Sequence, residues 1–179
     1  SMNRNLLILG AGGHGRVVKE IAEATGFFDK IDFLDDDSEA AIGECKDFQS
    51  YVEEYANAFV AVGNNQLRYE WLIKLTEAGF NIATLIHHTA YVSSSATVGE
   101  GAVVGAKAAI SANVVIGRGC IIGLGALVDH DSQVNECAHI NTGAVVKAGS
   151  VVERLTKIDA GGVWFRQEEV EAYSLEVGV

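Results

Sequence analysis

The 179-residue chain contains no proline, few positively charged side chains and few cysteines. It has 13 lysines and arginines against 24 aspartates and glutamates, which gives a formal net charge of -11. This excess of negative charge argues against binding to nucleic acid or to an anionic membrane surface. Three cysteines, an odd number, fit a reducing compartment better than a disulfide framework. Their spacing matches no zinc motif, so no metal is expected.

Long apolar runs are also missing from the sequence. No segment reaches the roughly 20 apolar residues that a transmembrane helix needs, and no secretory signal is recognised at the start. We therefore expect a cytoplasmic protein that binds neither membrane nor nucleic acid. The length suits one large domain or two small ones.

The second half of the chain repeats every six residues. Between Ala90 and Gly161 it divides into twelve hexads, and the third place of each hexad is Val or Ile. These twelve residues are Val92, Val98, Val104, Ile110, Ile116, Ile122, Val128, Val134, Ile140, Val146, Val152 and Ile158. Such repeats indicate a parallel β-helix, because an inward β-branched side chain packs on its equivalents in the coils above and below. An α-helix would need apolar residues at spacings of three and four.

The first half reads as a small α/β unit with parallel strands. An apolar run at Leu6–Leu9 precedes the glycine-rich segment 10–15 and then a helical spacing of apolar residues over 16–25. This is the context in which a glycine loop and a helix N-terminus bind phosphate, although a tight turn without a ligand is the alternative. Three or four strands make half of a dinucleotide fold, so NAD is not expected. The other expected elements are strands at 31–34, 58–62 and Asn81–Ile86 and helices at 47–55 and 66–78.

Several short motifs occur in a fixed order between about Leu6 and Ser150, namely GAGGHG, FLDDD, FVAVGNNQLR, LIH and hexads that contain DHD. In this combination the chain resembles the bacterial sugar acyltransferases that acetylate UDP-linked 4-amino sugars or sialic acid. The resemblance implies an α/β half-Rossmann domain over residues 2–86 and a left-handed parallel β-helix over 87–166. Three hexads would form one coil, giving about four coils, and residues 167–179 would form a tail or cap.

The resemblance also implies the substrates and where they bind. Acetyl-CoA would donate the acetyl group, and a homotrimer would form its site between adjacent β-helices. The acetyl-CoA contacts would be His139 and the backbone N–H groups at Ala148 and Gly149. The residues that would bind the UDP-sugar are Gly12, Gly13, His14, Asp35, Asp36 and Gly63.

His130 and Asp131 are the candidate catalytic pair. An amine that attacks a thioester must lose a proton, and a histidine of near-neutral pKa can accept it. The resemblance assigns the base to His130 and the supporting carboxylate to Asp131. Because neighbours in a strand face opposite ways, the pair can meet only if the chain turns there. A solvated turn residue is the alternative for both His130 and His139, and a metal site involving histidine is a further one.

The leading hypothesis is an acetyl-CoA-dependent N-acetyltransferase acting on a UDP-linked 4-amino sugar. The alternatives are O-acetylation of sialic acid or another sugar, and a non-catalytic nucleotide-binding β-helix. The last is motivated by the departure from the family pattern after Ser150, where the repeat is short. Trp164 takes the third place of a thirteenth hexad and is expected to close the end of the β-helix, with a short helix over Glu168–Val177.

Overall fold

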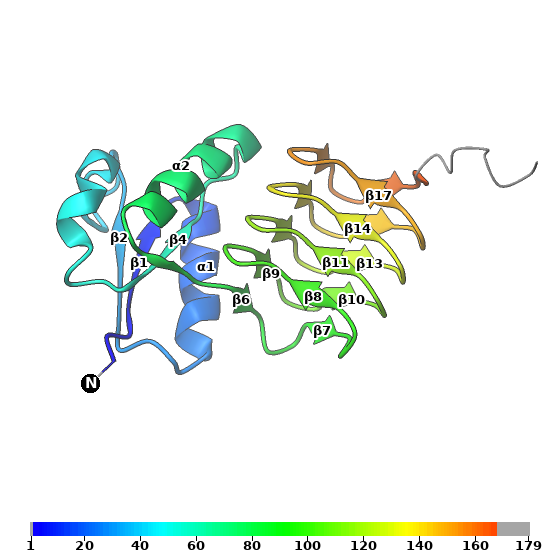
Figure 1. Cartoon of the computed structure of the whole chain (residues 1–179), viewed down its shortest axis with the longest axis horizontal. Helices are drawn as coiled ribbons and strands as arrows, with labels where there is room; N and C mark the ends of the chain where they lie inside the picture. The colour runs from blue at the N-terminus through cyan, green and yellow to red at the C-terminus, as the bar shows by residue number, and fades with distance from the viewer. Residues whose placement is uncertain (1, 168–179) are drawn as a thin grey trace, which may run out of the picture.

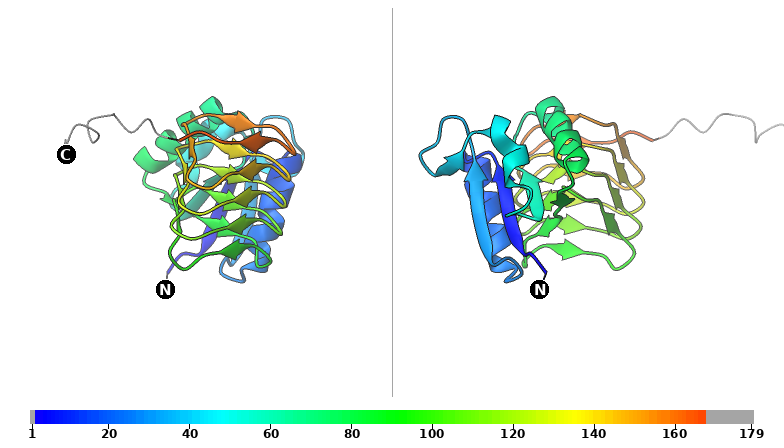
Figure 2. Two further views of the ribbon diagram at one scale, coloured as in Figure 1. Left: turned by 90° about the vertical axis from the view of Figure 1, so that its right-hand side faces the viewer. Right: turned by 60° about the vertical axis from the view of Figure 1, so that its left-hand side comes forward.

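A computed structural model describes residues 2–167 and shows an α/β domain packed beside a β-helix (Figure 1). The β-helix has three flat sides and is called the prism below (Figure 2). This order of units confirms the α/β domain followed by a parallel β-helix. The helix expected over Glu168–Val177 lies outside the described residues.

The N-terminal domain is built on a five-stranded parallel sheet with the order β3-β2-β1-β4-β5. The side chains of its central strand β1 alternate between two cores: Leu6 and Ile8 pack with helix α1, whereas Leu7 and Leu9 pack with helix α2. Because both faces are covered, β1 is a continuous apolar run. The elements are β1 (Asn5–Leu9), α1 (Gly13–Ala24), β2 (Lys30–Leu34), β3 (Ala41–Gly43), the 3-10 helix η1 (Cys45–Tyr51), β4 (Asn57–Val60), α2 (Asn65–Glu77) and β5 (Asn81–Ile82).

Two sequence predictions in this domain need correction. The short strand β3 was not expected, because three residues carry no recognisable pattern. The strand expected over Asn81–Ile86 is two strands: β5 pairs with β4, whereas β6 (Leu85–Ile86) pairs with the prism strand β9. Ile86 lies opposite Val104 and so occupies the third place of an earlier hexad. The prism therefore begins before Ala90.

The prism has three faces, each a parallel sheet. The docked face packs on the N-terminal domain and has the order β18-β15-β12-β9-β6; the open face is β19-β16-β13-β10-β7; the third face is β17-β14-β11-β8. With three strands to a coil, the fourteen strands β6–β19 make more than the four coils expected, because further hexads at both ends join the repeat. The prism strands after β6 are β7 (Tyr91–Val92), β8 (Thr97–Val98), β9 (Val103–Val104), β10 (Ala109–Ile110), β11 (Val115–Ile116), β12 (Ile121–Ile122), β13 (Leu127–Val128), β14 (Gln133–Val134), β15 (His139–Ile140), β16 (Val145–Val146), β17 (Val151–Val152), β18 (Lys157–Ile158) and β19 (Val163–Trp164).

The third-place residues form the core of the prism, as the sequence predicts. Ile110, Ile140 and Val146 have no exposed surface, and they belong to one cluster that runs through successive coils. At the last coil, Trp164 packs against this cluster and its Nε1 donates a hydrogen bond to Val151 O at 2.9 Å. Among residues 2–167, no helix combines the length and the apolar character that crossing a bilayer requires.

Coils also contact each other through side chains spaced by 18 residues. On the corner between the third face and the docked face, Arg118 lies 3.0 Å from Glu136 and 3.7 Å from Glu100. Arg154 lies 3.3 Å from Glu136, which extends the ladder to the next coil. Such partly exposed pairs are individually weak, so the ladder is expected to add little to the stability of the prism.

Candidate functional site

The two halves of the N-terminal sheet diverge between β1 and β4. Helix α1 leaves β1 toward one face of the sheet and α2 leaves β4 toward the other. In open parallel sheets such a switch point forms a crevice at the carboxyl ends of the strands, where ligands bind. The glycine segment and the loop Val62–Asn64 border this crevice, and both lead into helix N-termini that favour anions.

Glycine is required at particular places in the glycine loop. Gly10 has φ 102°, and a Cβ there would lie 2.6 Å from Ala61 O. A Cβ on Gly15 would lie 2.0 Å from Gly10 O. By contrast, a Cβ on Gly12 would meet no atom within 4 Å and one on Gly13 only the Arg16 side chain at 4.0 Å. Gly10 and Gly15 are therefore required by the shape of the loop, whereas Gly12 and Gly13 leave the helix N-terminus open to a ligand.

Asp35 and Asp36 lie at the end of β2 and hold loops in place. Asp35 Oδ2 accepts a hydrogen bond from Ala11 N at 2.8 Å, and its Oδ1 accepts from Asp37 N at 2.9 Å. The bond from Ala11 is the main reason that the pKa of Asp35 is lowered. Asp36 Oδ1 accepts from Cys45 N at 2.9 Å. Both carboxylates are engaged with the backbone, and their contact with a nucleoside stays a prediction.

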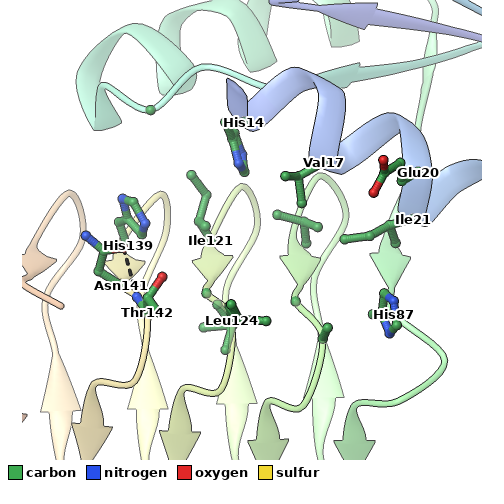
Figure 3. A pocket seen from close by; sticks show the side chains of 16 residues that line it. His14, Val17, Glu20, Ile21, His87, Ile121, Leu124, His139, Asn141 and Thr142 are labelled. Atoms are coloured by element: carbon green, nitrogen blue, oxygen red, sulfur yellow. Dashed lines mark hydrogen bonds between the residues drawn. The ribbon is translucent and has the colours of Figure 1, made fainter. Parts of the chain in front are cut away.

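A cavity of about 550 Å³ lies between α1 and the docked face of the prism (Figure 3). His14 and Val17 point into it from α1, and Ile121 and His139 from the prism strands. Gly63 also lines this cavity, so the cavity meets the loop that borders the crevice. A mostly apolar cavity of this size with a few polar groups is typical of a small-molecule site.

His14 and His139 supply the unpaired polar atoms of this cavity. His14 Nε2 and His139 Nδ1 are buried and have no hydrogen-bond partner within residues 2–167. Burial, followed by the positive charge of Arg68, lowers the pKa of each imidazole to about 4. Both rings are therefore neutral near pH 7, and each can offer one donor and one acceptor to a ligand.

His130 lies elsewhere, on the corner between the open face and the third face. It follows β13 in a turn, and 57% of its side chain is exposed. Asp131 has φ 60°, and this turn brings its Oδ2 to 2.8 Å from His130 Nδ1. A carboxylate accepts only, so the proton is held on Nδ1 and Nε2 carries the lone pair. The hydrogen bond to Asp131 is the main cause of the raised pKa of His130, with a smaller contribution from the charge of Asp129.

Asn113 supports this pair and was not predicted from the sequence. Its Nδ2 donates to Asp131 Oδ1 at 3.2 Å, so Asp131 is held from both sides. Asn113 occupies the same corner one coil earlier, 18 residues before Asp131. That spacing is the signal in the sequence that could have identified it.

Ala148 and Gly149 lie on the same corner as His130, one coil later. Gly149 N donates a hydrogen bond to His130 O at 2.9 Å. That N–H is therefore engaged within the prism, and the contact of Ala148 and Gly149 with acetyl-CoA stays a prediction. Among the predicted site residues, His14, Gly63 and His139 line the cavity, whereas His130 and its neighbours lie at the corner. The others, Gly12, Gly13, Asp35 and Asp36, lie at the glycine loop and at the end of β2. His130 is not among the residues that line the cavity.

Metal ligands do not gather in the part of the chain that the structure describes. Residues 2–167 contain no group of three or more His, Cys, Asp or Glu side chains arranged to hold a metal ion.

Comparison with known proteins gives close matches in sequence and structure. Residues 5–75 match the family described as PglD N-terminal domain. The acetyltransferase domain of PglB from Neisseria gonorrhoeae FA1090, in complex with acetyl coenzyme A, superposes with a TM-score of 0.88 and 38% identity, over 93% of this chain and 83% of that one. A mutant of GDP-perosamine N-acetyl transferase from Caulobacter crescentus, in complex with CoA and GDP-perosamine, gives a TM-score of 0.81 and 32% identity, over 91% and 89%.

Proposed function

Because the chain belongs to the bacterial sugar acyltransferases with a left-handed β-helix, we propose that it transfers an acetyl group from acetyl-CoA to the amine of a UDP-linked 4-amino sugar. The chain is an acetyltransferase, as its relatives show, which sets aside the non-catalytic alternative. The relative that binds GDP-perosamine is an N-acetyl transferase, and this favours an amine over a hydroxyl as the acceptor.

The observation that carries this proposal is the position of the cavity. Gly63 lines it and also lines a second hollow of about 540 Å³ at the N-terminus of α2, together with Leu155 and Lys157. A diphosphate bound at the N-terminus of α1 would place the attached sugar beside His14, on the second residue of that helix. The amino sugar would then lie between the α/β domain and the prism.

The reaction follows from the chemistry of a thioester and an amine. The amine nitrogen attacks the thioester carbonyl carbon, a C–N bond forms, and His130 Nε2 accepts the proton that the amine loses. The tetrahedral intermediate then collapses, the C–S bond breaks and CoA leaves as the thiol after taking up a proton. Backbone N–H groups would stabilise the oxyanion. Asp131 holds the tautomer of His130 that makes this transfer possible.

We infer that a second copy of the chain brings His130 to the cavity, because His130 is not among the residues that line it. The open face carries an outward apolar row in register across its strands, and Tyr91 and Val163 at its ends are 62% and 63% exposed. The row comprises Tyr91, Ala109, Leu127, Val145 and Val163. Packing of this row against the prism of another copy would remove its apolar side chains from water. We therefore include the homotrimer in the proposal.

An acceptor panel tests the proposed function. The purified protein is incubated with acetyl-CoA and, separately, a UDP-linked 4-amino sugar, GDP-perosamine, CMP-sialic acid or free sialic acid. Release of CoA and an amide-linked acetyl product are expected with the UDP-sugar. Turnover of GDP-perosamine alone would replace the nucleotide in the proposal, and an ester product from sialic acid alone would overturn N-acetylation.

Replacement of the base is the matching test of mechanism. His130→Ala should lower kcat by at least about 100-fold, because a positioned general base contributes about two to four orders of magnitude. The oligomeric state of the variant is measured by size-exclusion chromatography with light scattering. Unchanged kcat in an intact oligomer would remove His130 from the mechanism.

A further inference from the structure

Arg68 is the one charged side chain within residues 2–167 that is fully buried, with 1% of its surface exposed. It lies in the first turn of α2, next to the loop Val62–Asn64 that borders the crevice, called the crevice loop below. No carboxylate pairs with it among the ion pairs of the described residues. A buried cation without a counter-ion is costly, so its hydrogen bonds must compensate for the lost hydration.

On one side the guanidinium contacts two consecutive coils of the prism. Its Nε donates to Gly119 O at 2.7 Å, and its Nη2 donates to Cys137 O at 2.8 Å. Asn65, the first residue of α2, donates from Nδ2 to Leu155 O at 2.8 Å and so reaches a third coil. These three carbonyls occupy equivalent corner positions, and the two side chains therefore fix α2 to the prism at three levels.

On the other side the guanidinium contacts the crevice loop. Its Nη1 donates to Val62 O at 3.0 Å and to Gly63 O at 3.3 Å. Its Nη2 also donates to Asn65 Oδ1 at 2.8 Å, which ties together the two residues that hold the prism. The same guanidinium therefore hydrogen-bonds both the prism and the loop that borders the crevice and the cavity.

We propose that Arg68 is a positioning residue that fixes the Val62–Asn64 loop to the prism and so sets the spacing between a bound nucleotide sugar and His139. This inference rests on the proposed function for the identity of the ligand, but not for the geometry. Only arginine suits the position, because its planar fork offers five donors in fixed directions, whereas lysine offers three on a single atom.

The charge of Arg68 has a second consequence for the cavity. It helps to lower the pKa of both His14 and His139, although burial is the larger cause for each. Lys157 acts on His139 in the same direction, and the thiols of Cys120 and Cys137 face Arg68 itself. Glu20 and His87 are the other titratable groups that line the cavity. Arg68 therefore supplies a fixed positive charge behind two neutral imidazoles, which favours an anionic ligand.

The test compares Arg68→Lys with Arg118→Lys, a matched control on the same side of the prism. Arg118 pairs with glutamates on the surface and contacts neither the loop nor the cavity. In the ligand-free protein, Arg68→Lys should speed amide hydrogen exchange over residues 62–67, and the control should not. With substrates, Arg68→Lys should raise KM for the nucleotide sugar by at least about tenfold, a loss of about 1.4 kcal/mol in binding. KM for acetyl-CoA should stay within about twofold of its original value.

A milder variant keeps the inference testable if Arg68→Lys does not fold. Asn65→Ala removes one partner of the guanidinium and the bond to Leu155 O but leaves the other four bonds of Arg68 in place. It should change the same exchange rates and the same KM in the same direction, by less. Wild-type exchange over residues 62–67 in the folded variants, or an equal rise in KM for both substrates, would overturn the positioning role. Exchange is measured without substrate, so a faster loop in a protein inactive on every acceptor would instead indicate that the proposed function is wrong.

Discussion

The pair His130 and Asp131 shows how a single backbone angle makes a site. Asp131 adopts φ 60°, a conformation that costs most side chains about 1–2 kcal/mol per residue. Asp and Asn tolerate it better, because their short polar side chains bond locally. The sequence indicates the two residue types and the need for a turn between them. The spacing of 18 residues relates Asn113 to Asp131, but the spacing alone does not show that the Asn113 side chain reaches the carboxylate.

The pH dependence of activity tests the role of Asp131. The hydrogen bond to Asp131 raises the pKa of His130 above 6.5, so activity should fall as the pH drops through that raised value and His130 becomes protonated. Asp131→Asn should move this acid limb to lower pH and also lower kcat, because Asn no longer fixes the tautomer. The measurement is a profile of kcat/KM against pH. Asp129→Asn serves as the comparison, with a smaller shift in the same direction expected; an unmoved limb in Asp131→Asn would contradict the assignment.

The two cavity histidines should make the ligand-free protein sensitive to mild acid. Their pKa in the folded state is about 4, below the 6.5 of an exposed histidine. The unfolded chain therefore binds more protons, and the free energy of unfolding should decrease as the pH falls from about 6.5 toward 4. The double variant His14→Asn with His139→Asn should show a shallower decrease. Urea midpoints at pH 7 and pH 5 measure this, and equal slopes in both proteins would count against buried neutral rings.

At the scale of elements, the hexad pattern predicts the prism because each coil repeats the same local choice. An inward Val or Ile at every third place meets its own equivalents, so no long-range information is needed. Prediction failed where that pattern ended. The strand over Asn81–Ile86 was assigned as a single element because six mostly extended residues do not reveal that the first two pair in one sheet and the last two in another.

The core of the prism should be sensitive to the loss of a single inward side chain. Ile110→Ala removes a fully buried residue and should lower the free energy of unfolding by about 2–5 kcal/mol through lost burial and a cavity. Val115→Ala, at an outward position of β11, the next strand along the chain, should change it by less than about 0.5 kcal/mol. Denaturant unfolding of both variants gives the comparison. Similar losses at the two positions would contradict the inward and outward assignment.

At the scale of the whole molecule, the cavity with His14 and His139 lies apart from the corner that carries His130, although the proposed reaction needs both. The sequence and the resemblance predict both groups, but not that the cavity is built by the docking of α1 on the prism. Arg68 was missed for the same reason. A single arginine in a helix ordinarily lies in solvent, and only the docking of two domains shows that it is buried.

The apolar row on the open face gives a test of assembly. Leu127→Glu places a carboxylate in the middle of the row and should dissociate the oligomer while leaving the coil folded, because the side chain points outward. Activity should fall with the loss of the oligomer. Thr97→Glu on the third face adds the same charge outside the row and should leave the assembly intact. Light scattering and circular dichroism measure the two effects. A Leu127→Glu protein that keeps its mass in solution would show that another surface is used.

The spacing of 18 residues between contacts of successive coils limits how this chain can change in length. An insertion or deletion of 18 residues at a corner adds or removes one whole coil, and every later side chain stays on the same face of the prism. A gain of six residues instead turns every later residue onto the next face, so His139 would leave the cavity and Leu155 would leave Asn65. We expect homologues of different length to differ in the prism by whole coils. The residues that join the two domains should stay on the coils that contact the α/β domain.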